Sequence, residues 1–277
     1  MRQFDVFVFD ENYDEAQGKI PQPPFTDEEL GWFFTNDWNK HLNEIEGEWV
    51  VFAHPSIKID REFLNNLADV TDSFPMVDAF APRIRVGFRI SSENSAGTNK
   101  RFLGGYLLKP AAKGSGFVAI DENAPLRYVA APHPFLAVFS RRIIQRTGGF
   151  DTTLPPTARL ADFTLRMMHA GGKMFSVPYL VAQATTDEAA FVRGVTTETA
   201  PHAKTAQAQQ QETAPDLKST AIILSKAFGA EASIPFALHH PSVIPTLLAG
   251  RKERKAKRAA ATQLSKLKKE FLVQVSK

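Results

Sequence analysis

The segment from His133 to Gln183 constrains the fold more than any other part of the chain. An apolar run over 135–139 reads as a buried strand, and the basic stretch after it ends at the pair Gly148-Gly149. A second periodic stretch ends at Gly171-Gly172, and an apolar run then leads to Pro178. Because paired glycines and prolines end regular elements, the segment predicts a strand, a short helix, a second helix and a strand that ends at Pro178. That succession is typical of an α/β domain.

The first half of the chain predicts elements of the same kind. Residues 4–10 alternate and are rich in strand-forming types, so we expect a strand there. Thr26 is a helix N-cap candidate before an acidic turn, which predicts a helix over 26–46 that ends at Gly47. The short run over 48–53 is apolar from Trp49 onward, as in a central parallel strand, and residues 60–70 predict another helix. The apolar positions that recur at helical spacing in the first helix are Leu30, Phe33, Phe34, Trp38, Leu42 and Ile45.

Composition excludes several classes of protein. The chain has 277 residues and no cysteine, so it can form neither disulfides nor thiolate metal sites. No apolar run approaches the roughly 20 residues that a membrane helix needs, and the start of the chain does not resemble a secretory signal. We therefore expect a cytoplasmic protein.

The composition also divides the chain into parts. Residues 184–216 are rich in Thr, Ala and Gln, which is typical of a linker or mobile loop, and residues 219–229 predict a helix after it. We expect a main domain over 1–185, a linker or loop over 186–217, and a helical C-terminal region over 218–277.

The end of the chain is strongly basic. Residues 251–277 hold ten Lys or Arg against two Glu, and their apolar residues follow a helical stripe. A basic amphipathic helix of this kind favours binding to an anionic membrane surface, which would place the protein at the inner membrane face. The same stripe would equally suit packing on the protein's own core or pairing with a second copy. Nothing else in the sequence indicates a nucleic-acid partner.

The order and spacing of these elements resemble a family 2 glycosyltransferase domain of the GT-A fold. The likeness rests on Arg141-Arg142 followed by Gly148-Gly149-Phe150-Asp151, on the Asp162–Arg166 segment, and on the final strand before Pro178. In the first half, Asn39, Gly47 and the run Trp49–Phe52 also fit. The resemblance implies a mostly parallel sheet flanked by helices, although the chain begins about one βα unit later than that family does.

That resemblance implies a protein that transfers a sugar from a nucleotide-sugar to a glycan acceptor, such as one for the cell surface. It places Asp10 at the nucleotide base and gives Asp162 the part of general base toward the acceptor. Asp162 also fits a helix-terminal carboxylate, and Arg166 is equally explained as its partner four residues on. Arg141 and Arg142 would neutralise phosphate, or would form a solvated basic face.

The usual metal site of that family is absent from the sequence. Where the family has Asp-x-Asp, this chain has His54-Pro55-Ser56, and Gln183 and Ala184 stand where a downstream His is frequent. Mg²⁺ and Mn²⁺ prefer several hard oxygen ligands, so a divalent cation is not supported by this motif and we assign no metal ligand. The residues that we expect to contact a nucleotide-sugar are Asp10, Glu11, Asn39, His54, Ser56, Arg141, Arg142 and Arg166.

Two functions follow from these observations. The first is an inverting glycosyltransferase in which arginines replace the metal at the leaving diphosphate. The second is a catalytically degenerate GT-A-like domain that binds a glycan, a nucleotide or a protein. Three departures from the family pattern favour the second function. The Asp-x-Asp motif is lost, Arg159-Leu160 stands where the family has an acidic pair, and the first βα unit is missing.

Overall fold

A computed structural model gives the fold. It describes residues 2–10, 13, 23–25, 30–89, 98–109, 116–185, 214–227, 236–237 and 241–246, and the side chains of 87–101 are outside that description. The strands are β1 (Phe4–Phe9), β2 (Leu30–Thr35), β3 (Trp49–Ala53), β4 (Ile57–Lys58), β5 (Ala79–Arg89), β6 (Thr98–Leu103), β7 (Tyr106–Leu108), β8 (Phe117–Ala119), β9 (Arg127–Tyr128), β10 (Leu136–Ser140) and β11 (Met174–Ala184). The helices are α1 (Arg61–Ser73), α2 (Arg141–Thr147), α3 (Pro156–His169) and α6 (Leu217–Ala227), with 3₁₀ turns at Leu42–Glu44 and Pro241–Val243.

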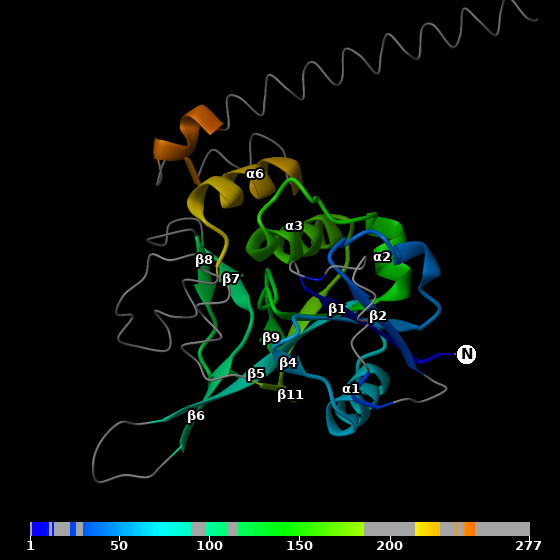
Figure 1. The fold of residues 1–277 in the computed structure, drawn as a ribbon. Helices are drawn as coiled ribbons and strands as arrows, with labels where there is room; N and C mark the ends of the chain where they lie inside the picture. Colours follow the sequence, from blue (N-terminus) through cyan, green and yellow to red (C-terminus); the bar gives the residue numbers. More distant parts are fainter. Residues whose placement is uncertain are drawn as a thin grey trace, which may run out of the picture.

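A mixed, mostly parallel sheet forms the centre of the molecule (Figure 1). Its strand order is β2-β1-β3-β10-β5-β11-β4, and β1 pairs in parallel with both β2 and β3. β10 is antiparallel to β3 and to β5, whereas β11 is parallel to β5. The parallel strands therefore share one carboxyl edge, and the helices complete the α/β fold that the sequence predicts.

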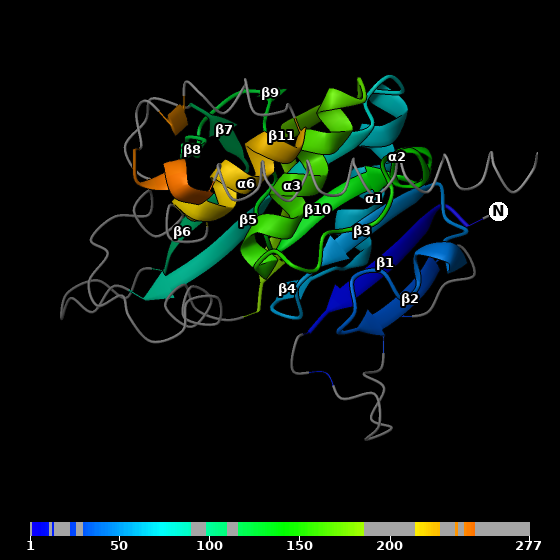
Figure 2. The same ribbon diagram turned by 90° about the horizontal axis from the view of Figure 1, so that it is seen from above.

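Helices cover both faces of this sheet, as the view from above also shows (Figure 2). α1 packs its apolar side against alternate residues of β1, β3 and β5, including Val6, Val51 and Phe80. The opposite residues of these strands, such as Phe7 and Phe52, pack with α2 and α3. The alternation of burial along each strand thus separates two core layers.

α6 is docked on the same side as α3. Its Ile223 and Leu224 share a third apolar cluster with Ala161 and Leu165 of α3 and with the β7–β8 hairpin. The predicted helix over 219–229 therefore corresponds to α6. The division into a main domain, a linker and a C-terminal region stays a prediction, and the basic segment 251–277 lies outside the described residues.

The helix predicted over 26–46 is wrong. Residues 30–35 form β2, which pairs along its whole length with β1, and only a 3₁₀ turn at 42–44 follows. The apolar residues fit both periods because Trp32, Phe33 and Phe34 are consecutive, and pairing with β1 decided the outcome. Phe33 packs on the α3 side and Trp32 on the α1 side, as a strand requires.

The strand expected to end at Pro178 instead continues to Ala184. The register of β11 against β5 shifts between Ser176 and Val181, and Pro178 lies within that irregularity. A proline is tolerated there because a bulged segment has no ladder position that requires its missing N–H. This continuation carries Gln183 and Thr185 to the carboxyl edge of the sheet.

Candidate functional site

A cavity lies at the carboxyl edge of β1 and β2. Its volume is about 290 Å³, at the lower end of the roughly 300–1,000 Å³ of ligand pockets. Open α/β sheets generally bind ligands at this edge. The cavity is lined by Val8, Asp10, Tyr13, Pro24, Trp32, Phe34, Pro55, Ile57, Lys58, Ile59 and Thr185.

Most of the cavity wall is apolar and aromatic, with a few polar groups. Trp32 and Phe34 project from the same face of β2, and their rings lie 6.3 Å apart between centroids and nearly parallel. The indole N–H of Trp32 is buried and has no hydrogen-bond partner among the described residues. Asp10, which follows β1, supplies a carboxylate, and Lys58 of β4 supplies a cation. A buried donor without a partner is costly unless a ligand engages it.

His54 begins the turn that follows β3 and is held from two sides. Its backbone N–H donates to the carbonyl of Phe135 at 2.9 Å, and its ring stacks on the Phe135 ring at 4.3 Å between centroids. Its Nδ1 accepts from the Ser56 backbone N–H at 3.2 Å and lies 2.7 Å from the Ser56 hydroxyl. Burial lowers the pKa of His54, with the nearby Asp10 carboxylate opposing that shift. The imidazole is therefore neutral, with its proton on Nε2.

These residues do not fit the divalent cation that the GT-A resemblance implies. The Nδ1 atom of His54 and the hydroxyl of Ser56 face each other, and the amide oxygen of Gln183 accepts a hydrogen bond from Arg85. Among the described residues, no three His, Cys, Asp or Glu side chains are grouped closely enough to hold a metal ion. One imidazole with a hydroxyl and an amide is a poor ligand set for Mg²⁺ or Mn²⁺.

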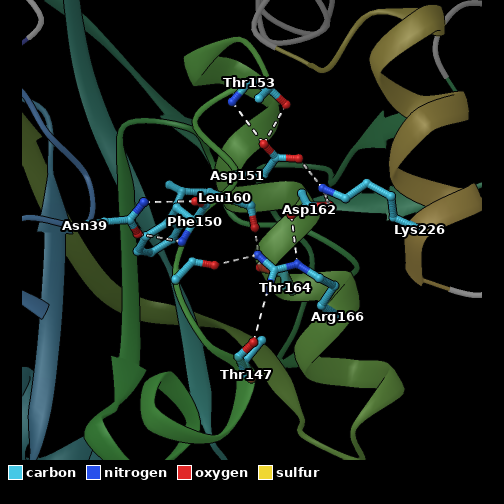
Figure 3. A network of polar contacts seen from close by, with 11 residues as sticks. Asn39, Thr147, Phe150, Asp151, Thr153, Leu160, Asp162, Thr164, Arg166 and Lys226 are labelled. Atoms are coloured by element: carbon cyan, nitrogen blue, oxygen red, sulfur yellow. Dashed lines mark hydrogen bonds and ion pairs between the residues drawn. The ribbon is translucent and has the colours of Figure 1, made fainter. Parts of the chain in front are cut away.

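Asp162 lies away from the cavity, on the buried side of α3. Its side chain is fully buried, its Oδ2 accepts from Arg166 Nε at 2.8 Å, and Lys226 Nζ of α6 lies 3.2 Å from its Oδ1 (Figure 3). Arg166 also donates to the carbonyls of Thr147 at 3.1 Å and Gly149 at 2.9 Å. Lys226 contacts Asp151 as well. The network ties α3 to the glycine turn and to α6.

The two arginines of α2 lie at the amino edge of the parallel strands, opposite the cavity. Arg141 donates to the carbonyl of Glu46 at 3.3 Å, just before β3 begins. Arg142 pairs with Asp78 at 2.7 Å, just before β5 begins. The structure therefore brings Asp10, His54 and Ser56 to one edge, and it does not bring Arg141, Arg142, Asp162 or Arg166 to them. Glu11 lies outside the described residues.

Asn39 holds the turn after the glycine pair. Its Nδ2 donates to the carbonyl of Phe150 at 3.0 Å, and its Oδ1 accepts from the Phe150 N–H at 2.8 Å (Figure 3). A Cβ at Gly149 would lie 2.5 Å from Asn39 Oδ1, so a larger residue here would displace the Asn39 side chain. Asn39 does not line the cavity.

Replacing Asn39 should destabilise the fold without any ligand present. We expect Asn39→Ala to lower the free energy of unfolding by about 2 kcal/mol, because two hydrogen bonds are lost and the Phe150 amide loses its partner. Gly149→Ala should displace the side-chain amide of Asn39 and so break the same contact. The double variant should therefore lose less stability than the sum of the two single variants. Urea unfolding measures both effects, and strict additivity would contradict the contact.

The sequence did not indicate Trp32, Phe34, Lys58 or Thr185 as site residues. Trp32 and Phe34 were assigned to a helix, so their position on one strand face was missed. Thr185 reaches the site because its N–H and hydroxyl donate to the Ser56 carbonyl at 2.7 and 3.0 Å. The run Trp32-Phe33-Phe34, read with the alternation of a strand, was the signal that would have found two of them.

The chain is similar in structure to glycosyltransferases. The structure of GalNAc-T7 with UDP, GalNAc and Mn²⁺ matches with a TM-score of 0.52 at 10% identity, over 92% of this chain and 54% of that one. This chain therefore spans about half the length of that protein. Similarity was also found to the mannosyltransferase PcManGT of Pyrobaculum calidifontis in complex with GDP-Man and Mn²⁺, with a TM-score of 0.38 at 15% identity over 91% of this chain and 87% of that one. S. aureus TarS 1–349 in complex with UDP matches with a TM-score of 0.40 at 13% identity, over 86% of this chain and 70% of that one.

Comparison of the sequence with protein-family models and with curated proteins found no match. No helix in the described ranges has the length and apolarity needed to cross a bilayer. The chain has a GT-A-like fold, as its resemblance to a family 2 glycosyltransferase domain implied.

Proposed function

We propose that this GT-A-like protein binds a nucleotide-sugar at the carboxyl edge of its sheet, with the nucleoside in the cavity beside Asp10. The observation that carries the proposal is the unsatisfied indole N–H of Trp32 in the wall of that cavity. The structural similarity to GalNAc-T7 supports it, because the structure of that protein holds UDP.

The chemistry of the cavity suits a nucleobase. A base has two apolar faces and a polar rim of donors and acceptors, and aromatic side chains stack on such faces. Trp32 and Phe34 supply the apolar wall, the indole N–H supplies a donor, and Asp10 supplies an acceptor. The volume of about 290 Å³ suits the nucleoside part, so the sugar end would extend beyond the cavity.

Binding is supported better than sugar transfer through Asp162. A general base must come within hydrogen-bond reach of the acceptor hydroxyl, and Asp162 is fully buried and paired with Arg166 and Lys226. Transfer to a glycan acceptor remains the finer proposal from the resemblance. The basic segment 251–277 as a contact to an anionic membrane or to a second copy also stays a prediction.

Removing the indole N–H should weaken nucleotide binding. We expect UDP, GDP or dTDP sugars to raise the thermal unfolding midpoint of the wild-type protein, because a ligand that binds only the folded state stabilises it. Trp32→Phe keeps an aromatic wall but removes the donor, so affinity measured by calorimetry should fall by about tenfold. Asp10→Asn should weaken binding of the same ligand.

Phe33→Leu is the matched control, because Phe33 is on the same strand but packs on the opposite face. It should leave affinity unchanged. The proposal fails when none of these nucleotide-sugars binds the wild-type protein, with or without Mn²⁺.

A further inference from the structure

Three polar residues form a row across adjacent strands near the cavity. Lys58 of β4 is the register partner of Gln183 of β11, and Gln183 is the register partner of Arg85 of β5. Register partners project from the same face of a sheet, so the three side chains stand side by side. With strands about 4.8 Å apart, the two cationic residues are separated at their Cα atoms by about 10 Å.

The row lies at the carboxyl edge of the sheet, as the cavity does. Lys58 lines the cavity itself, and Gln183 is two residues before Thr185, which also lines it. Strands β5 and β11 run parallel to each other, and Arg85 and Gln183 lie toward their carboxyl ends. A nucleoside seated beside Asp10 would therefore have Lys58 in the same cavity wall, and Gln183 and Arg85 follow Lys58 along the edge.

Few groups in the described structure compensate these cations. Arg85 Nη2 donates to the neutral amide oxygen of Gln183 at 3.0 Å. Lys58 Nζ lies 3.3 Å from Asp60 Oδ2, but the other oxygen of Asp60 accepts the Phe63 N–H as the N-cap of α1. The Lys58–Asp60 pair is exposed, so it holds Lys58 only weakly. Both cations remain able to engage an anion.

The diphosphate of a nucleotide-sugar requires positive charge, which a divalent metal usually supplies. The ligand set at His54, Ser56 and Gln183 does not fit such a metal, as described above. Lys58 and Arg85 flank Gln183, at the edge where the missing metal would have been expected. A lysine acts as a point charge toward phosphate, and an arginine can bind two of its oxygens at once.

We propose that Lys58 and Arg85 bind the diphosphate of the ligand directly and replace the divalent cation. This inference rests on the proposed nucleotide-sugar function and names the residues that hold its charged part. It reassigns to β4 and β5 the phosphate contact that the sequence suggested for Arg141 and Arg142.

The experiment compares nucleoside and diphosphate binding in EDTA. Calorimetry with UDP and GDP, alongside uridine and guanosine, gives the contribution of the diphosphate without any metal. We expect the preferred diphosphate to bind the wild-type protein more tightly than its nucleoside. Lys58→Met and Arg85→Gln should each weaken diphosphate binding by about tenfold, because a charge-assisted contact is lost. Arg85 does not line the cavity, so Arg85→Gln should leave nucleoside binding unchanged.

Arg85→Lys keeps the charge without the planar fork and should lose less affinity than Arg85→Gln. Lys173→Met and Arg127→Gln are matched controls, since both residues are exposed and lie near the other end of β11. Lys58 is exposed at an edge strand, so Lys58→Met should fold even where a change at the half-buried Arg85 costs stability.

Two results overturn the inference while the proposed function stands. One is diphosphate binding that requires Mn²⁺ and is lost in EDTA. The other is diphosphate binding that is unchanged in both Lys58→Met and Arg85→Gln. Absence of binding to every nucleoside and nucleotide would reject the proposed function and this inference together.

Discussion

Asp162→Asn should lower the free energy of unfolding by about 3 kcal/mol. The carboxylate of Asp162 is fully buried and has two cationic neighbours, Arg166 at 2.8 Å and Lys226 at 3.2 Å. Asparagine has nearly the same shape but no charge, so Arg166 would lose its compensating anion and Lys226 would keep, among the described residues, only Asp151. Arg166 and Lys226 are partly exposed, which keeps the expected loss at the lower end of the range for buried ion pairs.

Urea unfolding of the ligand-free protein measures this effect. Asp151→Asn is the matched control, because Asp151 contacts the same Lys226 but is about one quarter exposed. It should cost about 1 kcal/mol. A loss below 1 kcal/mol for Asp162→Asn would show that the network contributes little, and would leave the carboxylate available for another role.

The same variant separates the two roles suggested for Asp162. A residue that only supports the fold should affect nucleotide-sugar affinity little once unfolded protein is accounted for. A general base should reduce turnover while affinity is kept. We expect unchanged affinity, because Asp162 does not line the cavity beside Asp10.

The protein should lose stability as the pH falls through the range in which free histidine titrates. His133 is completely buried, which lowers its pKa to about 3, and the neighbouring His54 adds to this shift. Its Nδ1 accepts the Phe135 N–H at 3.3 Å. Between pH 6.5 and 3 this histidine binds a proton in the unfolded chain but not in the folded protein, so stability falls as the pH falls. The slope approaches 1.4 kcal/mol per pH unit.

Denaturation at pH 7.5, 6.5, 5.5 and 4.5 tests this expectation. His133→Asn keeps an acceptor near the Nδ1 position but does not titrate. Between pH 6.5 and 4.5 the free energy of unfolding of this variant should therefore fall by about 2–3 kcal/mol less than that of the wild-type protein. The lowered pKa of His54 acts in the same direction and remains in the variant. Parallel profiles for the two proteins would contradict the assignment.

Asp151 affects a different pH range. Burial would raise its pKa, but hydrogen bonds from Lys226 and Thr153 lower the pKa of Asp151 to about 2. Its contribution is present above pH 3.8 and is lost as the pH falls toward 2. The window from pH 6.5 to 4.5 therefore lies above the range in which the contribution of Asp151 is lost.

The sequence predicted the elements whose periodicity had a single interpretation. The runs that became β1, β3 and β10 are apolar and short, and α2 ends at Gly148 with φ of +84°, in the region that favours glycine. Asp60 caps α1, which corresponds to the helix predicted over 60–70. The order of these elements predicted an α/β fold, and the resemblance to a family 2 glycosyltransferase domain, carried also by motifs such as Gly148-Gly149-Phe150-Asp151, predicted the GT-A-like fold.

The candidate site was only partly predictable. Asp10 and His54 were found because each follows a strand that could be recognised, and parallel strands end at a common edge. Arg141 and Arg142 were assigned to the same site, but β10 is antiparallel, so the helix after it begins at the opposite edge. Nothing in the local sequence gives the direction of a strand.

The sequence by itself determined which short segments are buried, where most helices end and that no thiolate site exists, because these depend on residue type and local period. Only the tertiary structure decided that residues 30–35 pair with β1, that Asp162 faces Lys226 of α6, and that Lys58, Gln183 and Arg85 stand in one row. Each of these joins residues far apart in the chain or on different elements. Strand pairing, register and helix docking set such contacts, and none of them is encoded in a local pattern.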